Sequence, residues 1–591
     1  MICSGWKATK TAAAQARKAR SAAHGSGIMR PGKRVLRQSA VLALLLLVVA
    51  ACAVPSPADD IVPAGETPMI TVDASAIQRP MSRRLLGQAV WYSWQAYAWD
   101  SAAQATQPTA LAAFASLGAG ILGHYPGVGV ITHDFHWQNM IGPLGQRTDP
   151  TPRQSSFDTP RYLEFGPDEY GRLLAEYRTA TGQPIDGSIQ VNIVNGTAEE
   201  AADWVEYMNA PNDGSNPGGG VDWAQTRADN GHPQPYGIHF WELGNEPYFT
   251  ASDIGSLTAE EYVNRIRQFV PLMKERDPSI EVMAYVNPFA IGDTATVGTA
   301  TKDIATGGGL TWSQRVIRDA GDYLDYLYFH WYGGWNDRRT DYDFMMTSMN
   351  TGLDPLLDRL AQDVANFAPS DAARQRLSRI MITEWNVYGG WVKPLAKGTA
   401  LQGALAYSRT LHTMAARDDV AGAIHLGLFA PFPKPTMRPR LADIREGYFL
   451  FRGEEDQSAI MGTAAAAVAQ LWSAAYQPNV VQAELTHAPV FSNGVPALDV
   501  TALRSDDGKA LSLIITNAGS TPAALQVNLS GQAGGPATLL TVSGSKLADN
   551  NSWKEPDKIT LERTTFSVDG PDFTLDVPAY SVQALLIGGG Q

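Results

Sequence analysis

The sequence is poor in cysteine. Only Cys3 and Cys52 occur among 591 residues. Cleavage of a leader before Cys52 leaves one cysteine, so neither an internal disulfide nor a cysteine-based zinc site is open to the mature chain. Stability must therefore come from a large apolar core, which a chain of this length is able to bury.

Positive charge is also scarce. The chain has 46 Lys and Arg residues against 59 Asp and Glu residues, for a formal net charge of −13. Nucleic acids and anionic membrane surfaces both attract basic faces. The composition therefore predicts no nucleic-acid partner, and membrane contact only through a covalent lipid.

The N-terminal region lacks an apolar run of membrane-spanning length. The segment Ala40–Ala51 is uncharged but shorter than the roughly 20 residues that a spanning helix needs. It follows a basic stretch, Arg30–Arg37, and ends in small residues before Cys52. This pattern is typical of a secretory leader with a bacterial lipobox, in which Cys52 is lipidated. We therefore expect an exported cell-surface or periplasmic lipoprotein; an ordinary signal peptide or a single anchor helix are the alternatives, and Met29 is an alternative start to Met1.

The chain divides by composition into five parts. Residues 1–52 are the leader with its lipobox, and residues 53–67, rich in Pro, Ala and Asp, form a flexible linker. Residues 68–84 hold a strand, 85–477 alternate between strand and helix patterns, and 478–591 contain short alternating segments separated by turns.

The part from 85 to 477 is predicted to be a (β/α)₈ barrel of the α/β class. Repeated strand–helix alternation indicates a parallel sheet, and eight such units indicate a closed barrel. The expected strands are Leu85–Trp91, Ala119–Tyr125, Ser188–Val194, Ile238–Leu243, Ile280–Val286, Tyr326–Tyr332, Ile380–Thr383 and Ala423–Phe429.

The C-terminal part is predicted to be an antiparallel β-sandwich. Its expected strands are Val480–Leu485, Ala497–Arg504, Ala510–Thr516, Ala524–Leu529, Ala537–Val542 and Ser581–Ile587. Turn residues separate these segments, as in a sandwich of short strands. The strand-like Met69–Asp73 is expected to pair into the same domain.

Two glutamate motifs follow expected barrel strands. Glu246 ends the segment Trp-Glu-Leu-Gly-Asn-Glu after the fourth strand, and Glu384 follows Met-Ile-Thr in the seventh. Catalytic side chains of such barrels lie at the carboxyl ends of the strands. Two facing carboxylates are what glycoside hydrolysis requires, with a separation of about 5–5.5 Å for a retaining mechanism. We expect Glu246 to be the general acid/base and Glu384 the nucleophile; the alternative is that each is a solvated or salt-bridged strand-end residue.

Other polar and aromatic residues near strand ends are candidates for the substrate pocket. Asn245 is placed to hydrogen-bond a sugar hydroxyl, and Trp385 to supply an apolar wall. His330 and Tyr332 share one side of a strand by alternation, so they are expected to reach the catalytic carboxylates. Weaker candidates are His124, Tyr125 and Trp137.

A metal centre or a cofactor is not expected. His133, Asp134 and His136 are close in sequence, but they lack the spacing of a helical zinc site. Neither a glycine-rich phosphate loop nor a serine-nucleophile elbow is evident in the required context.

The residues from about 68 to 591 resemble glycoside hydrolase family 51, the arabinofuranosidases of clan A. The segments that carry the resemblance, besides the two glutamate motifs, are Tyr125–Gly127, His136–Trp137, Ile141–Pro143, Phe165–Tyr170, Val191–Asn192 and Glu200–Asn209. The resemblance implies a retaining, exo-acting glycosidase, with Glu246 as acid/base, Glu384 as nucleophile, and Asn245 and Tyr332 lining the subsite. It also makes a homo-oligomer an expectation, because family members are often oligomers.

The chain departs from the family where the sugar binds. The segment Gly87–Tyr92 lacks the family's glutamate, Pro126–Gly129 lacks its asparagine, and His124 replaces an arginine. A site without partners for a given hydroxyl discriminates against that sugar. The expected activity is α-L-arabinofuranosidase on an oligo- or polysaccharide. Endo-glucanase, xylanase, glucuronidase and a non-catalytic carbohydrate-binding lipoprotein remain alternatives, and the sequence leaves the sugar, linkage, exo or endo action and oligomeric state open.

Overall fold

The computed structural model describes residues 61–62, 65–127, 129–151, 162–248, 255–288, 305–306, 309–333, 341–387, 398–431, 449–453 and 459–588. The leader, the lipobox cysteine Cys52 and most of the linker lie outside these residues. Among the helices that are described, none is both long and apolar enough to cross a bilayer.

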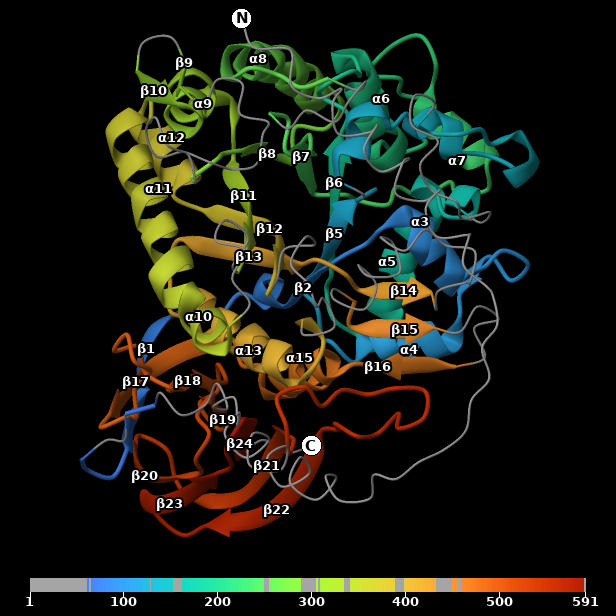
Figure 1. Ribbon diagram of the computed structural model, residues 1–591. Helices are drawn as coiled ribbons and strands as arrows, with labels where there is room; N and C mark the ends of the chain where they lie inside the picture. Colours follow the sequence, from blue (N-terminus) through green and yellow to red (C-terminus); the bar gives the residue numbers. More distant parts are fainter. Residues whose placement is uncertain are drawn as a thin grey trace, which may run out of the picture. The chain divides into compact units, whose positions relative to one another are not determined.

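Within the described ranges, eight parallel strands close a barrel (Figure 1). In order around the barrel they are β2 (Gly87–Ala89), β5 (Ile121–Tyr125), β6 (Asp186–Val191), β7 (Phe240–Leu243), β8 (Glu281–Tyr285), β11 (Tyr326–Tyr332), β12 (Ile380–Asn386) and β13 (Val420–His425). Each overlaps one of the predicted strands, with bounds that differ by a few residues, so the barrel prediction is confirmed.

Helices separate the barrel strands along the chain. The longer ones are α4 (Pro108–Ala115), α5 (Pro167–Thr181), α6 (Ala198–Asn209), α8 (Ala259–Arg276), α9 (Trp312–Ala320), α11 (Asp354–Phe367), α13 (Leu401–Ala415) and α15 (Ala464–Ala475). Shorter ones are α3 (Tyr92–Gln95), α7 (Trp223–Asp229), α10 (Tyr342–Ser348) and α12 (Asp371–Leu377). Helix α6 begins at Ala198, where the side chain of Thr197 caps it by accepting the backbone N–H of Glu200 at 3.0 Å.

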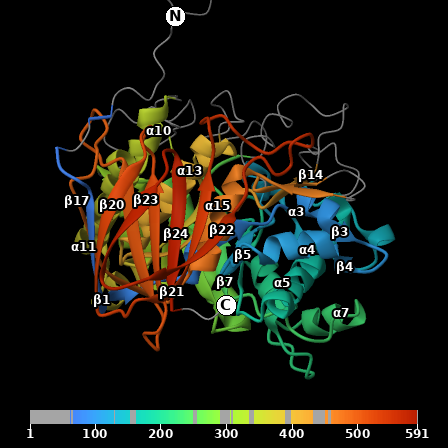
Figure 2. The ribbon, with the colours of Figure 1, turned by 90° about the horizontal axis from the view of Figure 1, so that it is seen from below.

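A second, mostly antiparallel sheet follows the barrel in the chain. In the part of the chain that is described it has nine strands, in the order β22, β21, β24, β19, β18, β17, β1, β20, β23. Their bounds are β1 (Met69–Pro80), β17 (Asn479–Thr486), β18 (Leu498–Arg504), β19 (Leu511–Asn517), β20 (Ala523–Ser530), β21 (Gly535–Ser543), β22 (Glu562–Val568), β23 (Asp572–Val577) and β24 (Ser581–Ile587). Figure 2 shows these strands side by side.

The N-terminal strand β1 completes this sheet. It pairs antiparallel with β17 and parallel with β20. Side chains from both halves of the sheet, such as Val72, Leu513 and Leu575, share one apolar core, which is the packing expected of a sandwich. The prediction that the strand before the barrel pairs into the C-terminal domain is therefore correct.

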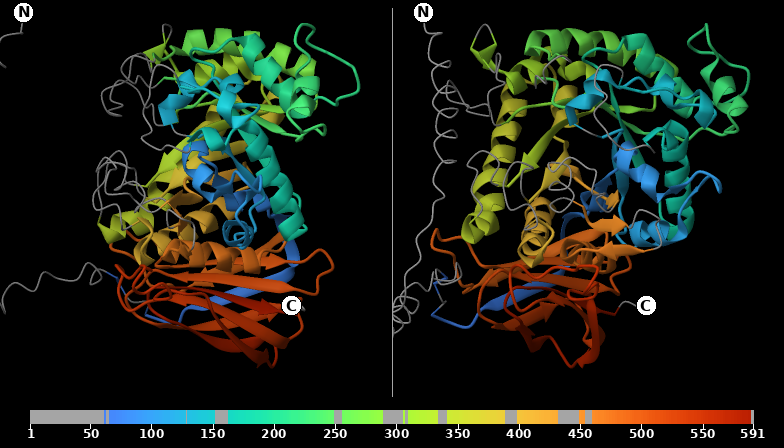
Figure 3. Two further views of the ribbon diagram at one scale, coloured as in Figure 1. Left: turned by 90° about the vertical axis from the view of Figure 1, so that its right-hand side faces the viewer. Right: turned by 45° about the vertical axis from the view of Figure 1, so that its right-hand side comes forward.

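Helices α13 and α15 lie between the barrel and this sheet (Figures 1 and 3). Every residue of α13 is buried. Its Ser408 Oγ lies 2.7 Å from Thr516 Oγ1 of β19, and Trp472 Nε1 of α15 donates to Ser408 Oγ at 2.9 Å. The barrel domain and the C-terminal sheet are therefore connected through α13 by buried hydrogen bonds.

Smaller sheets occur in the connections. These are β14 (Phe429–Pro431), β15 (Phe451–Gly453) and β16 (Ile460–Gly462), then β3 (Trp99–Asp100) with β4 (Ala105–Thr106), and β9 (Ala305–Thr306) with β10 (Leu310–Thr311). Phe429 belongs to β14 and not, as expected, to the eighth barrel strand, which ends at His425.

Candidate active site

The turn after β7 presents Glu246. Gly244 has φ +89°, and a Cβ there would lie 2.6 Å from Ile193 Cγ2, so the position requires glycine. Glu246 itself has φ +42°, which is uncommon for a residue with a side chain and marks a constrained turn. Its side chain is 25% exposed. The backbone here is therefore bent so that a carboxylate leaves the barrel wall and reaches solvent.

Hydrogen bonds from three neighbouring strands and loops fix this turn. Tyr328 Oη donates to the carbonyl oxygen of Gly244. His133 Nε2 lies 2.5 Å from the carbonyl oxygen of Asn245, and Gln190 Nε2 donates to Asn245 Oδ1 at 2.9 Å. Asn245 is buried beside Glu246, where it stays a candidate for contact with the sugar.

Strand β12 presents Glu384 toward the same point. Its pairing with β11 shifts by one residue between Phe329 and His330, so that His330 is level with Glu384. The Glu384 side chain is only 9% exposed. A nearly buried carboxylate and a partly exposed one thus come from strands that are far apart in the sequence.

A single histidine contacts both carboxylates. His330 Nδ1 lies 3.0 Å from Glu246 Oε1 and 3.5 Å from Glu384 Oε2. These two carboxylate oxygens are therefore at most 6.5 Å apart, the sum of the two distances. A retaining glycosidase holds its two carboxyl groups about 5–5.5 Å apart, and an inverting one about 6.5–9.5 Å. The observed bound favours the retaining arrangement.

Glu384 is held in its ionised form. Burial by itself would raise its pKa, but His330, His124 and Tyr332 outweigh burial and lower the pKa of Glu384 to about 2. Tyr332 Oη donates to Glu384 Oε2 at 2.5 Å, and His124 Nε2 contacts Glu384 Oε1 at 3.0 Å. A carboxylate with a low pKa is chemically suited to be a nucleophile.

His124 does not line a substrate pocket, contrary to expectation. Its ring is fully buried, with Nδ1 3.0 Å from Glu242 Oε2 and Nε2 3.0 Å from Glu384 Oε1. Both nitrogens are therefore occupied by carboxylates, and the residue acts on the site only through Glu384.

Tyr125 and Trp137 are also wrong as pocket residues. Both are buried. The Tyr125 ring stacks on Tyr170 at 4.5 Å, and the Trp137 indole stacks on Trp204 at 5.9 Å and donates to the carbonyl oxygen of Glu200 at 3.0 Å. Both rings therefore belong to the buried aromatic packing of the barrel domain, as is usual for large aromatic side chains.

Trp385 does not form a wall of the pocket either. It is buried, with ring centroids 4.9 Å from both Tyr407 and His425. Tyr407 lies on α13, so Trp385 faces the helix layer. Alternation along β12 makes this unavoidable, since Glu384 faces the barrel interior and its neighbour must face outward.

Two features of the site were missed by sequence reasoning. Glu242 is buried beside His124, and Trp91 packs with Trp94, Phe449 and Tyr332 next to the nucleophile. Strand alternation could have singled out Glu242, because successive side chains of a strand face opposite sides of the sheet. In the structure Glu242 pairs with Gln190 of β6. No sequence signal links Phe449 to Trp94, since that contact depends on the tertiary fold.

The donor atoms available near the nucleophile are poorly suited to a metal ion. Among the described residues, His124, His330 and Glu384 form a group with one donor atom each within 4.8 Å. His124 offers no free lone pair, however, because both nitrogens face carboxylates and the pKa of His124 is raised to about 10. His133 and His136, which are close in sequence, have separate partners: His133 Nε2 contacts the carbonyl oxygen of Asn245, and His136 Nδ1 contacts Glu200.

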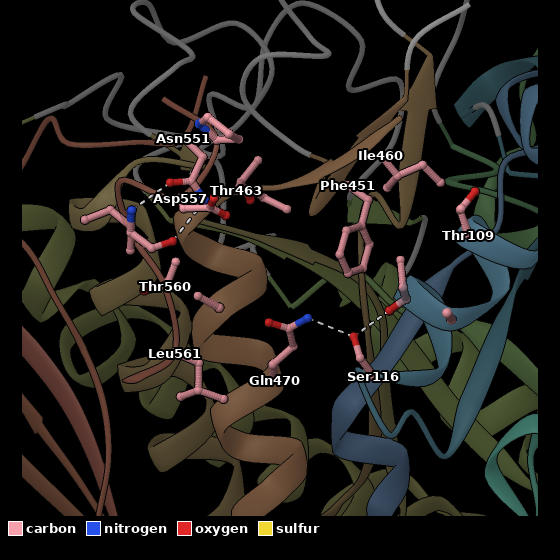
Figure 4. A pocket seen from close by; sticks show the side chains of 16 residues that line it. Thr109, Ser116, Phe451, Ile460, Thr463, Gln470, Asn551, Asp557, Thr560 and Leu561 are labelled. Atoms are coloured by element: carbon pink, nitrogen blue, oxygen red, sulfur yellow. Dashed lines mark hydrogen bonds between the residues drawn. The ribbon is translucent and has the colours of Figure 1, made fainter. Parts of the chain in front are cut away.

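A separate cavity of about 650 Å³ lies between the barrel and the C-terminal domain (Figure 4). It is lined by α4, α15, the β15–β16 hairpin and the segment 551–561. Gln470 Nε2 donates to Ser116 Oγ across its floor at 2.9 Å. Among the described residues that line it, Asp557 is the one carboxylate.

Comparison with known proteins agrees with this geometry. Residues 123–343 match the family model described as "Alpha-L-arabinofuranosidase 1 domain". The intracellular exo-alpha-(1->5)-L-arabinofuranosidase 1 of Bacillus subtilis is 26% identical over 270 residues, which cover 45% of this chain and 46% of that protein. Alpha-L-arabinofuranosidase C of Emericella nidulans is 31% identical over 159 residues, 27% of this chain and 28% of that one. The chain thus spans at most about half the length of these relatives.

Solved structures resemble a larger part of the chain. The alpha-L-arabinofuranosidase of Thermotoga maritima has a TM-score of 0.69 at 22% identity, covering 88% of this chain and 100% of that one. A family 44 xyloglucanase of Paenibacillus polymyxa has a TM-score of 0.55 at 15% identity, covering 89% and 100%. These likenesses establish the fold, and together with the sequence matches they confirm the resemblance to glycoside hydrolase family 51.

Proposed function

From a barrel that resembles family 51 and two carboxylates converging on one histidine, we propose that the chain is a retaining glycoside hydrolase. Glu246 protonates the leaving oxygen while Glu384 attacks the anomeric carbon. Water deprotonated by Glu246 then cleaves the glycosyl-enzyme. The carrying observation is that His330 Nδ1 lies within 3.5 Å of both carboxylates.

The geometry suits the division of roles. The attacking group has to be ionised, and Glu384 is the carboxylate that His330, His124 and Tyr332 hold at low pKa. The acid/base must exchange protons with water and with the leaving group. Glu246 is the more exposed of the two.

The leading activity is α-L-arabinofuranosidase. It is supported by the family model over residues 123–343 and by relatives that bear this name. The test is turnover of aryl α-L-arabinofuranosides, with aryl xyloside, glucoside and glucuronide run in parallel. Release of arabinose from the non-reducing end of an oligosaccharide would support exo action. Hydrolysis of a polysaccharide without turnover of any aryl glycoside would reject the exo reading.

An endo-acting glycanase is the second candidate, and one observation favours it. The segment Gly87–Tyr92 lacks a carboxylate, and Trp91 in it packs on Trp94 with ring centroids 4.8 Å apart, against a cluster that includes Tyr332. Aromatic faces near a catalytic carboxylate suit stacking on pyranose rings. Assay on xyloglucan, a β-glucan and xylan, with products sized by chromatography, discriminates this candidate from the first.

We further propose that the enzyme is exported as a lipoprotein anchored at Cys52. The support is the basic segment, the apolar run Ala40–Ala51 and the small residues before the cysteine. Mass spectrometry of the mature N-terminus should find a diacylglyceryl cysteine, and Cys52→Ser should release the protein from membranes. Recovery of the unchanged protein in the soluble fraction before and after this substitution would refute the anchor.

A further inference from the structure

Three side chains form a row beneath the candidate active site. Glu242 of β7, His124 of β5 and Glu384 of β12 follow one another, with nitrogen–oxygen distances of 3.0 Å on both sides of the imidazole. Glu242 and His124 are fully buried, and Glu384 is 9% exposed. Only the last member of the row is therefore open to a substrate.

Glu242 is a buried acid with no access to the sugar. Ser188 Oγ donates to its Oε1 at 2.7 Å, and His124 Nδ1 faces its Oε2. Removing a carboxylate from water is costly unless a counter-charge and hydrogen bonds compensate it. The structure supplies this compensation through His124, so any effect of Glu242 on the reaction must pass through that ring.

The backbone at His124 supports the same placement. His124 has φ +61°, and its N–H donates to Ser188 Oγ at 2.7 Å. A histidine in this left-handed region is uncommon and persists only where the surroundings hold it. The same serine hydroxyl thus connects the backbone of His124 with the carboxylate of Glu242.

His124 is an imidazolium in this setting. Burial alone would lower its pKa, but Glu242 and then Glu384 raise the pKa of His124 to about 10. The other groups that face the ring are His330, with ring centroids 5.4 Å apart, and Gln190, whose Nε2 lies 3.2 Å from His124 Nε2. The Gln190 nitrogen that faces the ring is a donor, and it donates to Asn245 Oδ1. Glu384 is therefore the acceptor for the proton on His124 Nε2.

The charge balance of this row changes during double displacement. When Glu384 bonds to the anomeric carbon, the bond from that carbon to the leaving oxygen breaks and Glu246 gives its proton to that oxygen. Glu384 becomes a neutral ester. The row then passes from two carboxylates around one imidazolium to one carboxylate and one imidazolium. Without Glu242 the ester state would leave a buried, unpaired imidazolium.

We propose that Glu242 and His124 are a positioning pair for the nucleophile. Glu242 keeps His124 protonated through both half-reactions, and His124 holds Glu384 ionised before attack and as the glycosyl-enzyme breaks down. Because histidine titrates, the pair makes the nucleophile's counter-ion titratable. This inference rests on the proposed function and concerns residues that do not touch the substrate.

The primary test is Glu242→Gln, which preserves the shape of the side chain and removes its charge. With a dinitrophenyl glycoside, whose leaving group needs no proton from Glu246, the basic limb of the profile of kcat against pH should move down by about one pH unit or more, since the imidazolium loses one of its two carboxylates. At pH 9 kcat should then fall by about twofold for a shift of one unit and by about tenfold for a shift of two units, with a much smaller loss at pH 5. Glu206→Gln, at a buried carboxylate paired with Arg276 at 3.3 Å, is the matched control and should leave the profile in place.

A second measurement does not depend on turnover. The chain has 10 histidines, so ¹⁵N-histidine labelling gives few enough ring signals to assign His124 by its loss in His124→Arg. The wild-type ring should be an imidazolium at pH 8, and in Glu242→Gln it should deprotonate at lower pH. In His124→Arg the part of the basic limb that His124 sets should be absent from the pH profile of the remaining activity, because arginine does not titrate in this range.

Each outcome decides something. The proposal would be overturned if Glu242→Gln lost the same factor in rate at every pH and left the titration of His124 unchanged. Glu242 would then have only a packing role. If Glu242→Gln does not fold, His124→Arg still tests it through the basic limb. A wild-type protein that hydrolyses none of the glycosides would reject the proposed function, whereas the His124 titration would still report on the pair.

Discussion

Replacement of Glu246 by alanine separates the two carboxylates by role. Among the described residues its side chain makes one hydrogen bond, to His330 Nδ1 at 3.0 Å, and is 25% exposed. The stability cost should therefore be small, about 1 kcal/mol or less. Alanine also tolerates φ +42° about as well as glutamate does, so the strain at this position is unchanged.

The catalytic cost should be much larger than the structural one. Loss of a general acid/base reduces rates by about 10²–10⁴-fold, which corresponds to about 2.7–5.5 kcal/mol in the barrier. The loss should depend on the substrate. An aryl glycoside with a dinitrophenolate leaving group needs no proton, so its glycosylation step should be nearly preserved. A methylumbelliferyl or disaccharide substrate needs the proton and should show the full loss.

The assay is stopped-flow release of the phenol followed by steady-state turnover, with and without azide. With dinitrophenyl glycoside the variant should give a burst and then slow turnover, because deglycosylation lacks its base. Azide should restore turnover and yield a glycosyl azide of retained configuration, since it attacks the ester on Glu384 without needing a base. The matched variant Glu384→Ala should give no burst. Equal loss for all leaving groups, with no effect of azide, would refute the assignment of Glu246.

Three further predictions follow from particular contacts. Glu384→Gln should abolish turnover by orders of magnitude and leave the melting temperature within a few degrees, because the amide keeps the shape of the buried side chain; an unchanged rate would rule out this nucleophile. Trp137→Ala should cost about 3–5 kcal/mol of stability with KM unaltered, measured by denaturant unfolding and kinetics, since Trp137 stacks on Trp204 in the core; a raised KM with full stability would restore it as a sugar contact. His412→Asn should weaken the dependence of stability on pH. Burial and Arg409 lower the pKa of His412 to about 3, below its unfolded value of about 6.5, so its contribution is complete above pH 6.5 and is lost as the pH falls toward 3. Melting temperatures measured from pH 7 to 4 should slope less in the variant than in the wild type, and identical slopes would contradict this origin.

The strands that were predicted and those that were missed differ in burial. All eight barrel strands are buried runs bounded by polar segments, and this is the strongest pattern a sequence carries. β22 was missed because six of its seven residues are exposed, so it carries no apolar alternation. β23 does alternate, with Phe573, Leu575 and Val577 on one face, and could have been found.

The candidate site divides in the same way. Strand-end position placed both glutamates, and alternation correctly put His330 and Tyr332 within reach of them. The same alternation predicts that Trp385, the neighbour of Glu384 on β12, faces away from the site and toward the surrounding helices, where it contacts Tyr407 of α13. Tyr125 and Trp137 were chosen for their chemistry and nearness in sequence, and burial, which only the packed helix layer creates, removed them from the pocket.

The sequence by itself determined the order of strands, the class of barrel and the two acidic side chains that meet at its carboxyl end, because periodicity and strand-end chemistry are local properties of the chain. Tertiary structure decided the charge state of the nucleophile. Glu242, His124 and Glu384 are separated by more than a hundred residues from one to the next in the chain, and only closure of the barrel brings them within 3.0 Å contacts. Electrostatic interaction in a buried site depends on distance in space and on exclusion of water, and neither quantity is written in the local sequence.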